Sequence, residues 1–198
     1  DIEIRGVGNM LGHNQSGHIA SVGFDLYCKL VEDMVKDIRG KKSDPRIETE
    51  LDLMVKGFIP KDYVPDLNQR LDFYRRMQVA SEYDEGLVIA SELEDRYGPH
   101  PESVAKLLAL LEIRMLCQRI HISKIELKHN DACLHLLPST AINPQILTSL
   151  FDERLSMQSE YKIKIRLDRK GWKTDLKLVA NYLQRLANSL LPVEIDNE

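Results

Sequence analysis

Apolar residues recur at helical spacing over several stretches of this chain. Residues 21–39 and 172–191 each place an apolar side chain at every third or fourth position, which is the period of an amphipathic helix. Residues 82–97 predict a further helix. The stretch 104–120 is apolar on almost every face, which is typical of a helix buried at the centre of a domain.

Capping residues predict where other helices begin. Asp66, with Gln69 three positions later, predicts a helix start of the capping-box type. The buried face of that helix would carry Leu71, Tyr74 and Met77. Ser81 can cap the helix at 82–97, which Gly98 would close. Asn143, followed by proline, predicts another helix that runs to about Leu155.

Other stretches alternate between apolar and polar residues, as half-buried strands do. Residues 47–55 and 161–167 show this alternation, and residues 122–127 and 132–136 flank a polar turn as in a β-hairpin. We therefore expect an α+β fold. A small, mostly antiparallel sheet would pack on the central helix at 104–120 of a helix-rich domain, preceded by a glycine-rich motif and a connecting helix.

Composition narrows the class of protein. The chain has 198 residues, is 43% hydrophobic and 29% charged, and carries a net charge of −4, so no basic field covers the whole sequence. No run is long enough to span a bilayer and no leader is evident, so no membrane partner is expected. The three cysteines, Cys28, Cys117 and Cys133, lie far apart in apolar contexts, which indicates reduced thiols and a cytoplasmic protein.

The first seventeen residues are dense in glycine, which indicates a shaped loop. Spacing of Gly6, Gly8 and Gly12 is close to a dinucleotide-binding pattern, but that pattern needs a helix that opens directly on it within a βαβ unit. A surface turn without chemistry is another interpretation. Because the chain begins at Asp1 within this motif, we expect it to be part of a longer protein.

The same segment resembles the end of the translocation motif of transcription-repair coupling factors and their relative RecG. The matching residues are Asp1, Glu3, Arg5, Gly6, Gly8, Leu11, Gly12, Gln15, Ser16 and Gly17. Val7 stands where RecG sequences tend to have proline, which favours the coupling factors. The resemblance implies that Arg5 and Gln15 help to couple ATP hydrolysis to movement on duplex DNA.

A second block resembles the C-terminal domain of the same family. Its matching residues are Pro60, Tyr63, Val64, Pro65, Asp66, Arg70, Leu71, Tyr74, Arg75 and Arg76. We expect Tyr63 and Tyr74 to be core anchors. By this resemblance residues 1–40 end the translocase module, the polar stretch 41–46 is a linker, and residues 47–198 form a C-terminal regulatory domain.

Two carboxylates in the predicted helix at 82–97 form the candidate site. Glu92 and Asp95 are three residues apart and share a helix face, so they can grip arginines of a partner. A solvated acidic face and acid–base catalysis are the alternatives. The resemblance implies that this pair contacts the UvrA-binding module of the same chain and thereby covers it.

The resemblance also implies the activity of the parent protein. The parent would be a helicase-like translocase that uses ATP and Mg²⁺, moves on duplex DNA, displaces stalled RNA polymerase and recruits UvrA for excision repair. This chain contains no G-x-x-x-x-G-K-[ST] loop and no evident nucleophile–base pair. We therefore expect no catalytic residues, no bound cofactor and no ATPase activity in this chain by itself.

Two other kinds of site remain open. The most basic stretch could bind nucleic acid, although it lacks interleaved exposed aromatic residues; it contains Lys162, Lys164, Arg166, Arg169, Lys170, Lys173 and Lys177. A metal could bind where His129, Cys133 and His135 cluster on the predicted hairpin. No matching second pair of ligands is present, so no metal is expected.

Overall fold

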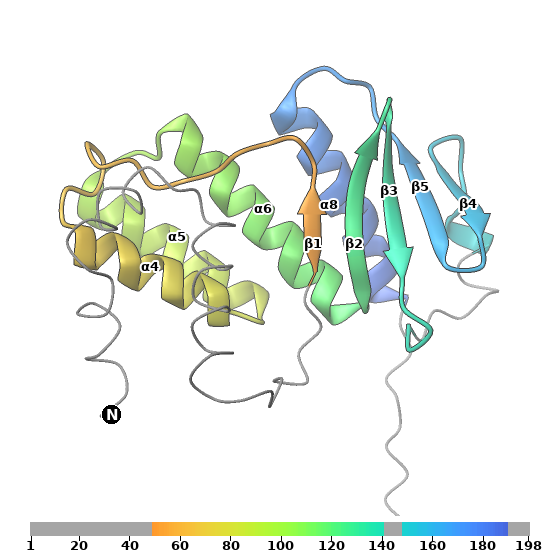
Figure 1. Cartoon of the computed structure of the whole chain (residues 1–198), viewed down its shortest axis with the longest axis horizontal. Coiled ribbons are helices and arrows are strands. Elements are labelled where there is room, and N and C mark those ends of the chain that lie inside the picture. Colours follow the sequence, from red (N-terminus) through yellow and green to blue (C-terminus); the bar gives the residue numbers. More distant parts are fainter. Residues whose placement is uncertain (1–48, 141–147, 190–198) are drawn as a thin grey trace, which may run out of the picture. The chain divides into compact units, whose positions relative to one another are not determined.

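The computed structural model describes residues 49–140 and 148–189 (Figure 1). The glycine-rich motif, the predicted helix at 21–39 and the predicted linker at 41–46 lie outside these residues. No described helix combines the length and the apolarity that crossing a bilayer requires.

The described residues divide into two compact units. The helical unit comprises Lys56–Leu108. The sheet unit comprises residues 49–55 together with the described residues from Ala109 onward. One helix, α6 (Glu102–Arg119), begins in the helical unit and ends in the sheet unit.

Two helices of the helical unit begin at side-chain caps. Helix α4 (Leu67–Val79) starts where the Asp66 carboxylate accepts the Gln69 backbone N–H at 2.9 Å, as predicted. Helix α5 (Tyr83–Tyr97) has Glu82 as its N-cap residue, where Ser81 was predicted. The backbone N–H groups of both Ser81 and Glu82 donate to the Glu85 carboxylate, at 2.7 and 3.1 Å, so Glu85 provides the cap.

The core of the helical unit joins these helices to the proline-bounded segment before them. Buried apolar side chains include Ile59, Val64, Phe73, Tyr74, Met77, Ile89, Leu93, Val104 and Leu107. Gly57 lies so close to α6 that an added Cβ would stand 2.3 Å from the Leu107 backbone nitrogen. Phe58 donates its backbone N–H to the Ser103 carbonyl at 3.1 Å, which fixes this close approach.

Buried hydrogen bonds hold the same segment in place. The Arg70 side chain is buried and donates to the carbonyls of Val64 and Pro65 at 2.6 and 2.9 Å. The Tyr74 hydroxyl accepts the Ile59 backbone N–H at 2.8 Å, and the Tyr63 hydroxyl donates to the Leu93 and Gly98 carbonyls. The prediction that Tyr74 anchors the core is confirmed. Tyr63 is half-buried, and its hydrogen bonds hold the C-terminal end of α5.

The sheet unit contains a five-stranded sheet in the order β1-β2-β3-β5-β4 (Figure 1). The strands are β1 (Glu50–Asp52), β2 (Ile122–Lys128), β3 (Asp131–Leu136), β4 (Leu155–Ser159) and β5 (Lys162–Arg166). Only β1 pairs in parallel, with β2, and the other pairings are antiparallel. The predicted α+β class with a mostly antiparallel sheet is therefore confirmed, as is the β2–β3 hairpin.

One face of the sheet is covered by α8 (Trp172–Asn188) and by the later residues of α6 (Figure 1). This core contains Ile113, Leu116, Cys117, Ile120, Ile125, Leu134, Ile163, Ile165, Val179, Leu183 and Leu186. Almost all of these side chains are fully buried, which confirms the prediction that the helix at 104–120 is a central burying element.

One strand prediction and one helix prediction need correction. The stretch 47–55 keeps its alternation of buried and exposed side chains over its described part, but only Glu50–Asp52 is paired as a strand. The helix predicted to run to Leu155 does not reach it, because Leu155 is the first residue of β4. The Asp152 carboxylate accepts the backbone N–H groups of Arg154 and Leu155, which turns the chain into the strand.

Candidate functional site

The two predicted site carboxylates lie on the last turns of α5. Glu92 is 31% exposed and bridges two arginines. Its Oε2 is 2.6 Å from Nη1 of Arg76, which belongs to α4, and its Oε1 is 2.8 Å from Nη1 of Arg96, one turn later on α5. Glu92 therefore joins α4 to α5 and is also partly exposed to solvent.

Both arginines are held in place by aromatic rings. The Arg76 guanidinium lies 5.4 Å from the centre of the Phe73 ring, and that of Arg96 lies 5.2 Å from the Tyr97 ring. Hydrogen bonding by Arg76 is the main cause that lowers the pKa of Glu92, and burial opposes it only in part. The carboxylate of Glu92 is therefore fixed in position and ionised.

Asp95 differs from Glu92 in having no donor bound to its carboxylate in the part of the chain that the structure describes. It is exposed, and within the described ranges its carboxylate makes no hydrogen bond and no ion pair. Three positions along a helix bring Asp95 and Glu92 to one face, which we call the carboxylate face of α5. The structure thus brings the two predicted residues together but shows one engaged and one open.

The acid–base interpretation of this pair gains no support. A carboxyl group that donates a proton near neutral pH needs a raised pKa, whereas the pKa of Glu92 is lowered. What the face offers chemically is a pair of ionised oxygen acceptors on a rigid helix, which suits a cationic partner.

Exposed apolar side chains near the start of α5 were not predicted from the sequence. Tyr83, Leu87 and Val88 are each about half exposed or more. Val88 lies one turn before Glu92 and two turns before Asp95, on the same side of the helix. The apolar run from Leu87 to Ile89 could have indicated them. Three consecutive residues point in different directions on a helix, and of these three only Ile89 is buried.

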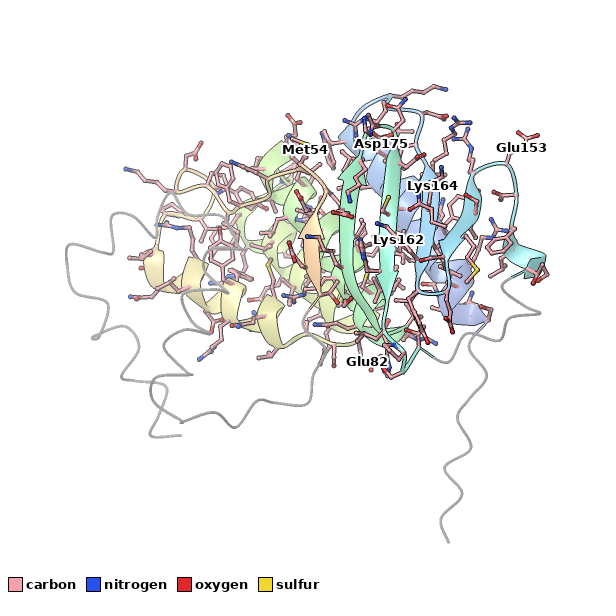
Figure 2. The ribbon with its side chains drawn as sticks, turned by 45° about the vertical axis from the view of Figure 1, so that its right-hand side comes forward. Met54, Glu82, Glu153, Lys162, Lys164 and Asp175 are labelled. Carbon is pink, nitrogen blue, oxygen red and sulfur yellow. The ribbon has the colours of Figure 1, made fainter. Side chains whose placement is uncertain are left out.

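The basic stretch at 162–177 is largely neutralised by neighbouring carboxylates. Figure 2 shows Lys162 and Lys164 among the side chains on the open face of the sheet. Four of the seven basic residues form ion pairs: Lys162 with Glu126, Lys164 with Asp131, Arg169 with Asp175 and Lys170 with Asp168. Tyr161 is exposed just before the stretch. This pairing lowers the positive charge available to nucleic acid, and binding by the stretch stays a prediction.

The cluster around Cys133 and His135 is an ion-pair network. The His135 Nε2 lies 2.8 Å from the Glu126 carboxylate, which also receives Lys128 at 2.7 Å. Hydrogen bonds from Lys128 and then His135 lower the pKa of Glu126 to about 2. In the part of the chain that the structure describes, no group of three or more His, Cys, Asp or Glu side chains is arranged to hold a metal ion.

The residues of the translocation motif lie outside the described residues: Arg5, Gly6, Gly8, Gly12, Gln15, Ser16 and Gly17. Their predicted role stays a prediction.

Comparisons with known proteins place the chain in a family. A family model described as the TRCF domain matches residues 53–147. The transcription-repair-coupling factor of Escherichia coli is 30% identical over 200 residues, which cover 96% of this chain and 17% of that protein. The factor of Myxococcus xanthus is 47% identical over 117 residues, which cover 58% of this chain and 10% of that protein. The chain thus spans a small part of the length of these relatives.

A solved structure shows the same fold. It is described as the crystal structure of the C-terminal domain of transcription-repair coupling factor, and it superposes with a TM-score of 0.66 at 17% sequence identity. The match covers 74% of this chain and 96% of that structure. This chain belongs to the transcription-repair coupling factor family and carries its C-terminal TRCF domain.

Proposed function

We propose that the TRCF domain of this chain covers the UvrA-binding module of a coupling factor, with the carboxylate face of α5 as the contact. In this proposal the whole protein is a cytoplasmic translocase that uses ATP and Mg²⁺ to displace stalled RNA polymerase from duplex DNA. Arg5 and Gln15 couple hydrolysis to movement. The cover keeps UvrA away until polymerase has been engaged.

The open carboxylate of Asp95 carries the proposal. An ionised side chain that is exposed on a rigid helix, without a bound donor among the described residues, can accept two parallel hydrogen bonds from one arginine. A bond formed there replaces a bond to water and does not have to displace a donor of the described residues. A cationic surface on the covered module fits this chemistry.

Glu92 has a different part in the contact. Both of its oxygens already accept a hydrogen bond, from Arg76 and Arg96, so an incoming arginine must use the remaining lone pairs or displace one of these two. Displacement would return little net energy, since one charge-assisted bond replaces another. We therefore expect Asp95 to contribute more than Glu92 to closure.

The test uses a full-length coupling factor that carries this chain as its C-terminal part. UvrA is titrated against wild type, Asp95→Asn, Glu92→Gln and the double variant, with no polymerase present. A tethered cover acts at an effective concentration of order millimolar, so a weak contact can mask the module. We expect UvrA affinity to rise in the order wild type, Glu92→Gln, Asp95→Asn and double variant.

Glu153→Gln is the matched control, because Glu153 is an exposed carboxylate of the sheet unit. It should leave UvrA affinity at the wild-type value. Equal UvrA affinity for wild type and the double variant would overturn the proposal. If Glu153→Gln also raised affinity, the effect would be one of net charge and the carboxylate face would have no special part.

A further inference from the structure

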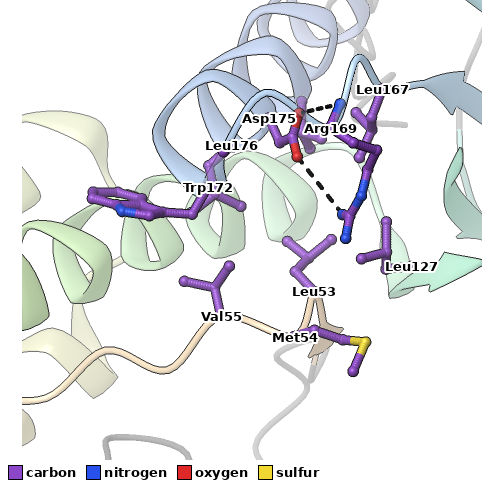
Figure 3. Close-up of a pocket in the computed structure, with 11 residues that line it drawn as sticks. Leu53, Met54, Val55, Leu127, Leu167, Arg169, Trp172, Asp175 and Leu176 are labelled. Carbon is purple, nitrogen blue, oxygen red and sulfur yellow. Dashed lines mark hydrogen bonds and ion pairs between the residues drawn. The ribbon is translucent and has the colours of Figure 1, made fainter. Parts of the chain in front are cut away.

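A small apolar cavity opens in the sheet unit where β1 ends and α8 begins (Figure 3). Its apolar lining includes Leu53, Val55, Leu127, Leu167, Leu176 and Val179. Its volume is about 170 Å³. Pockets for whole small molecules have volumes of about 300–1,000 Å³, whereas a cavity of about 150 Å³ holds one benzene ring. The cavity therefore suits a single apolar side chain.

A charged pair stands at the wall of this cavity. Asp175 is 7% exposed, and its carboxylate accepts the Arg169 backbone N–H at 3.2 Å. The Arg169 guanidinium makes only a loose contact with the other oxygen, at 3.7 Å (Figure 3). Because the backbone bond satisfies Asp175 in part and the Arg169 side chain is 43% exposed, the guanidinium has N–H groups left to donate to a second anion.

The backbone around the cavity is held in unusual conformations. Met54 and Arg169 are non-glycine residues in the left-handed region, with φ of 55° and 56°. Non-glycine residues adopt this region uncommonly, and they keep it only where the surrounding packing holds the backbone in place. The Met54 side chain is 82% exposed beside the cavity, where a flexible apolar side chain can close over a docked group.

We propose that this cavity is a docking site for an acidic peptide segment of a partner protein. One apolar side chain of that segment, of leucine or phenylalanine size, fills the cavity, and a neighbouring carboxylate pairs with Arg169. The choice of an acidic partner follows from charge: Lys173, next to lining residues, is an exposed cation, and Lys170 is 72% exposed with only a loose contact to Asp168 at 3.8 Å. This site accounts for part of the basic stretch and does not depend on the carboxylate face of α5.

The first experiment probes the full chain with a small mimic of such a segment. N-acetyl-L-leucine, which carries the side chain and a carboxylate, is titrated while two-dimensional NMR follows the backbone amides. A ligand of this size should bind with a dissociation constant of about millimolar. We expect saturable shifts at Leu53, Val55, Leu167 and Val179. N-acetyl-L-leucine amide, which lacks the charge, should bind about threefold to tenfold more weakly.

Three variants separate the two parts of the site. Arg169→Asn removes the guanidinium and keeps a residue that tolerates a positive φ, so it should abolish the preference for the carboxylate. Val55→Phe should fill the cavity and abolish binding of both probes. Lys177→Gln, which removes an exposed cation of α8 that does not line the cavity, should change neither affinity.

Several results would overturn the proposal. One is the absence of saturable shifts at the cavity. Another is equal binding of the acid and the amide by wild type, which would leave an apolar cavity with no charge recognition. A third is that short duplex DNA shifts these amides while N-acetyl-L-leucine does not, which would assign the basic rim to phosphate.

Discussion

Asp152 and Glu126 of the sheet unit are each surrounded by donors, whereas the carboxylate face of α5 in the helical unit is only half engaged. Asp152 accepts four hydrogen bonds, from the N–H groups of Arg154 and Leu155, the Tyr182 hydroxyl and Arg185. The Glu126 carboxylate contacts the side-chain nitrogens of Lys128, His135 and Lys162. Asp95, by contrast, has no donor within the described ranges.

The comparison separates structural acids from acids available for binding. A carboxylate that satisfies several donors fixes the chain around it, and its loss leaves those donors unpaired. A carboxylate without protein donors contributes little to the folded state and stays accessible to a partner. The following predictions are ordered from the largest expected effect to the smallest.

Acid should have the largest effect on stability, because it acts on all the donor-rich carboxylates together. The pKa of Glu126 is lowered from 4.5 to about 2, chiefly by Lys128 and then His135, and Arg154 lowers the pKa of Asp168. A lowered pKa in the folded state means that the unfolded state binds protons more readily. Stability should therefore be constant above a pH of about 4.5 and fall from there towards a pH of about 2.

Thermal unfolding of the chain across this pH range measures the effect. Glu126→Gln should flatten the dependence, since one of the shifted groups is then absent. A melting temperature that stays unchanged down to a pH of about 2 would show that these ion pairs contribute nothing to folding.

Asp152→Ala should be the most destabilising single substitution among these carboxylates, by about 2 kcal/mol. Burial raises the pKa of Asp152, but hydrogen bonds from Leu155, Tyr182 and Arg154 outweigh it and lower the pKa. The variant loses the turn that starts β4 and leaves the buried Tyr182 hydroxyl unpaired. Urea unfolding gives the free energy, with the exposed neighbour Glu153→Ala as the control.

Glu92→Gln should destabilise the chain by less than about 1 kcal/mol, because the Arg76 pair is about one third exposed and solvent screens it. The loss should shrink further in high salt. Urea unfolding at low and high salt checks both statements. If Glu92→Gln lowered the free energy of unfolding as much as Asp152→Ala, Glu92 would serve mainly to stabilise the fold.

Asp95→Asn should change the free energy of unfolding by less than about 0.5 kcal/mol, as expected for a surface residue whose carboxylate has no hydrogen bond or ion pair among the described residues. This is the smallest effect and the sharpest test of the comparison. A larger destabilisation would mean that Asp95 has a structural partner, and the contrast between the two units would fail.

Local patterns predicted the elements with strong periodicity. The hairpin, the apolar helix at 104–120 and the amphipathic helix from Trp172 lie where the sequence places them, because each buries a face that its spacing defines. Strand β4 was missed. Only Leu155 of this strand is buried, and pairing with β5 overrides the helical pattern before it.

The candidate site shows the same limit of local patterns, which do not indicate contacts between separate elements. Helical spacing correctly placed Glu92 and Asp95 on one face, because three residues make nearly one turn. Spacing could not show that Arg76, on a different helix, binds Glu92, since this contact depends on how α4 packs against α5. Nor could it indicate the cavity beside Met54, whose lining comes from segments more than a hundred residues apart.

The most direct test of the central claim is binding of the isolated UvrA-binding module of a coupling factor to this chain, followed by NMR of the chain's amides. The account predicts shifts centred on the last turns of α5, weaker binding in high salt, and a larger loss of affinity for Asp95→Asn than for Glu92→Gln. Shifts confined to the sheet unit, or equal affinity for Asp95→Asn and wild type, would contradict it.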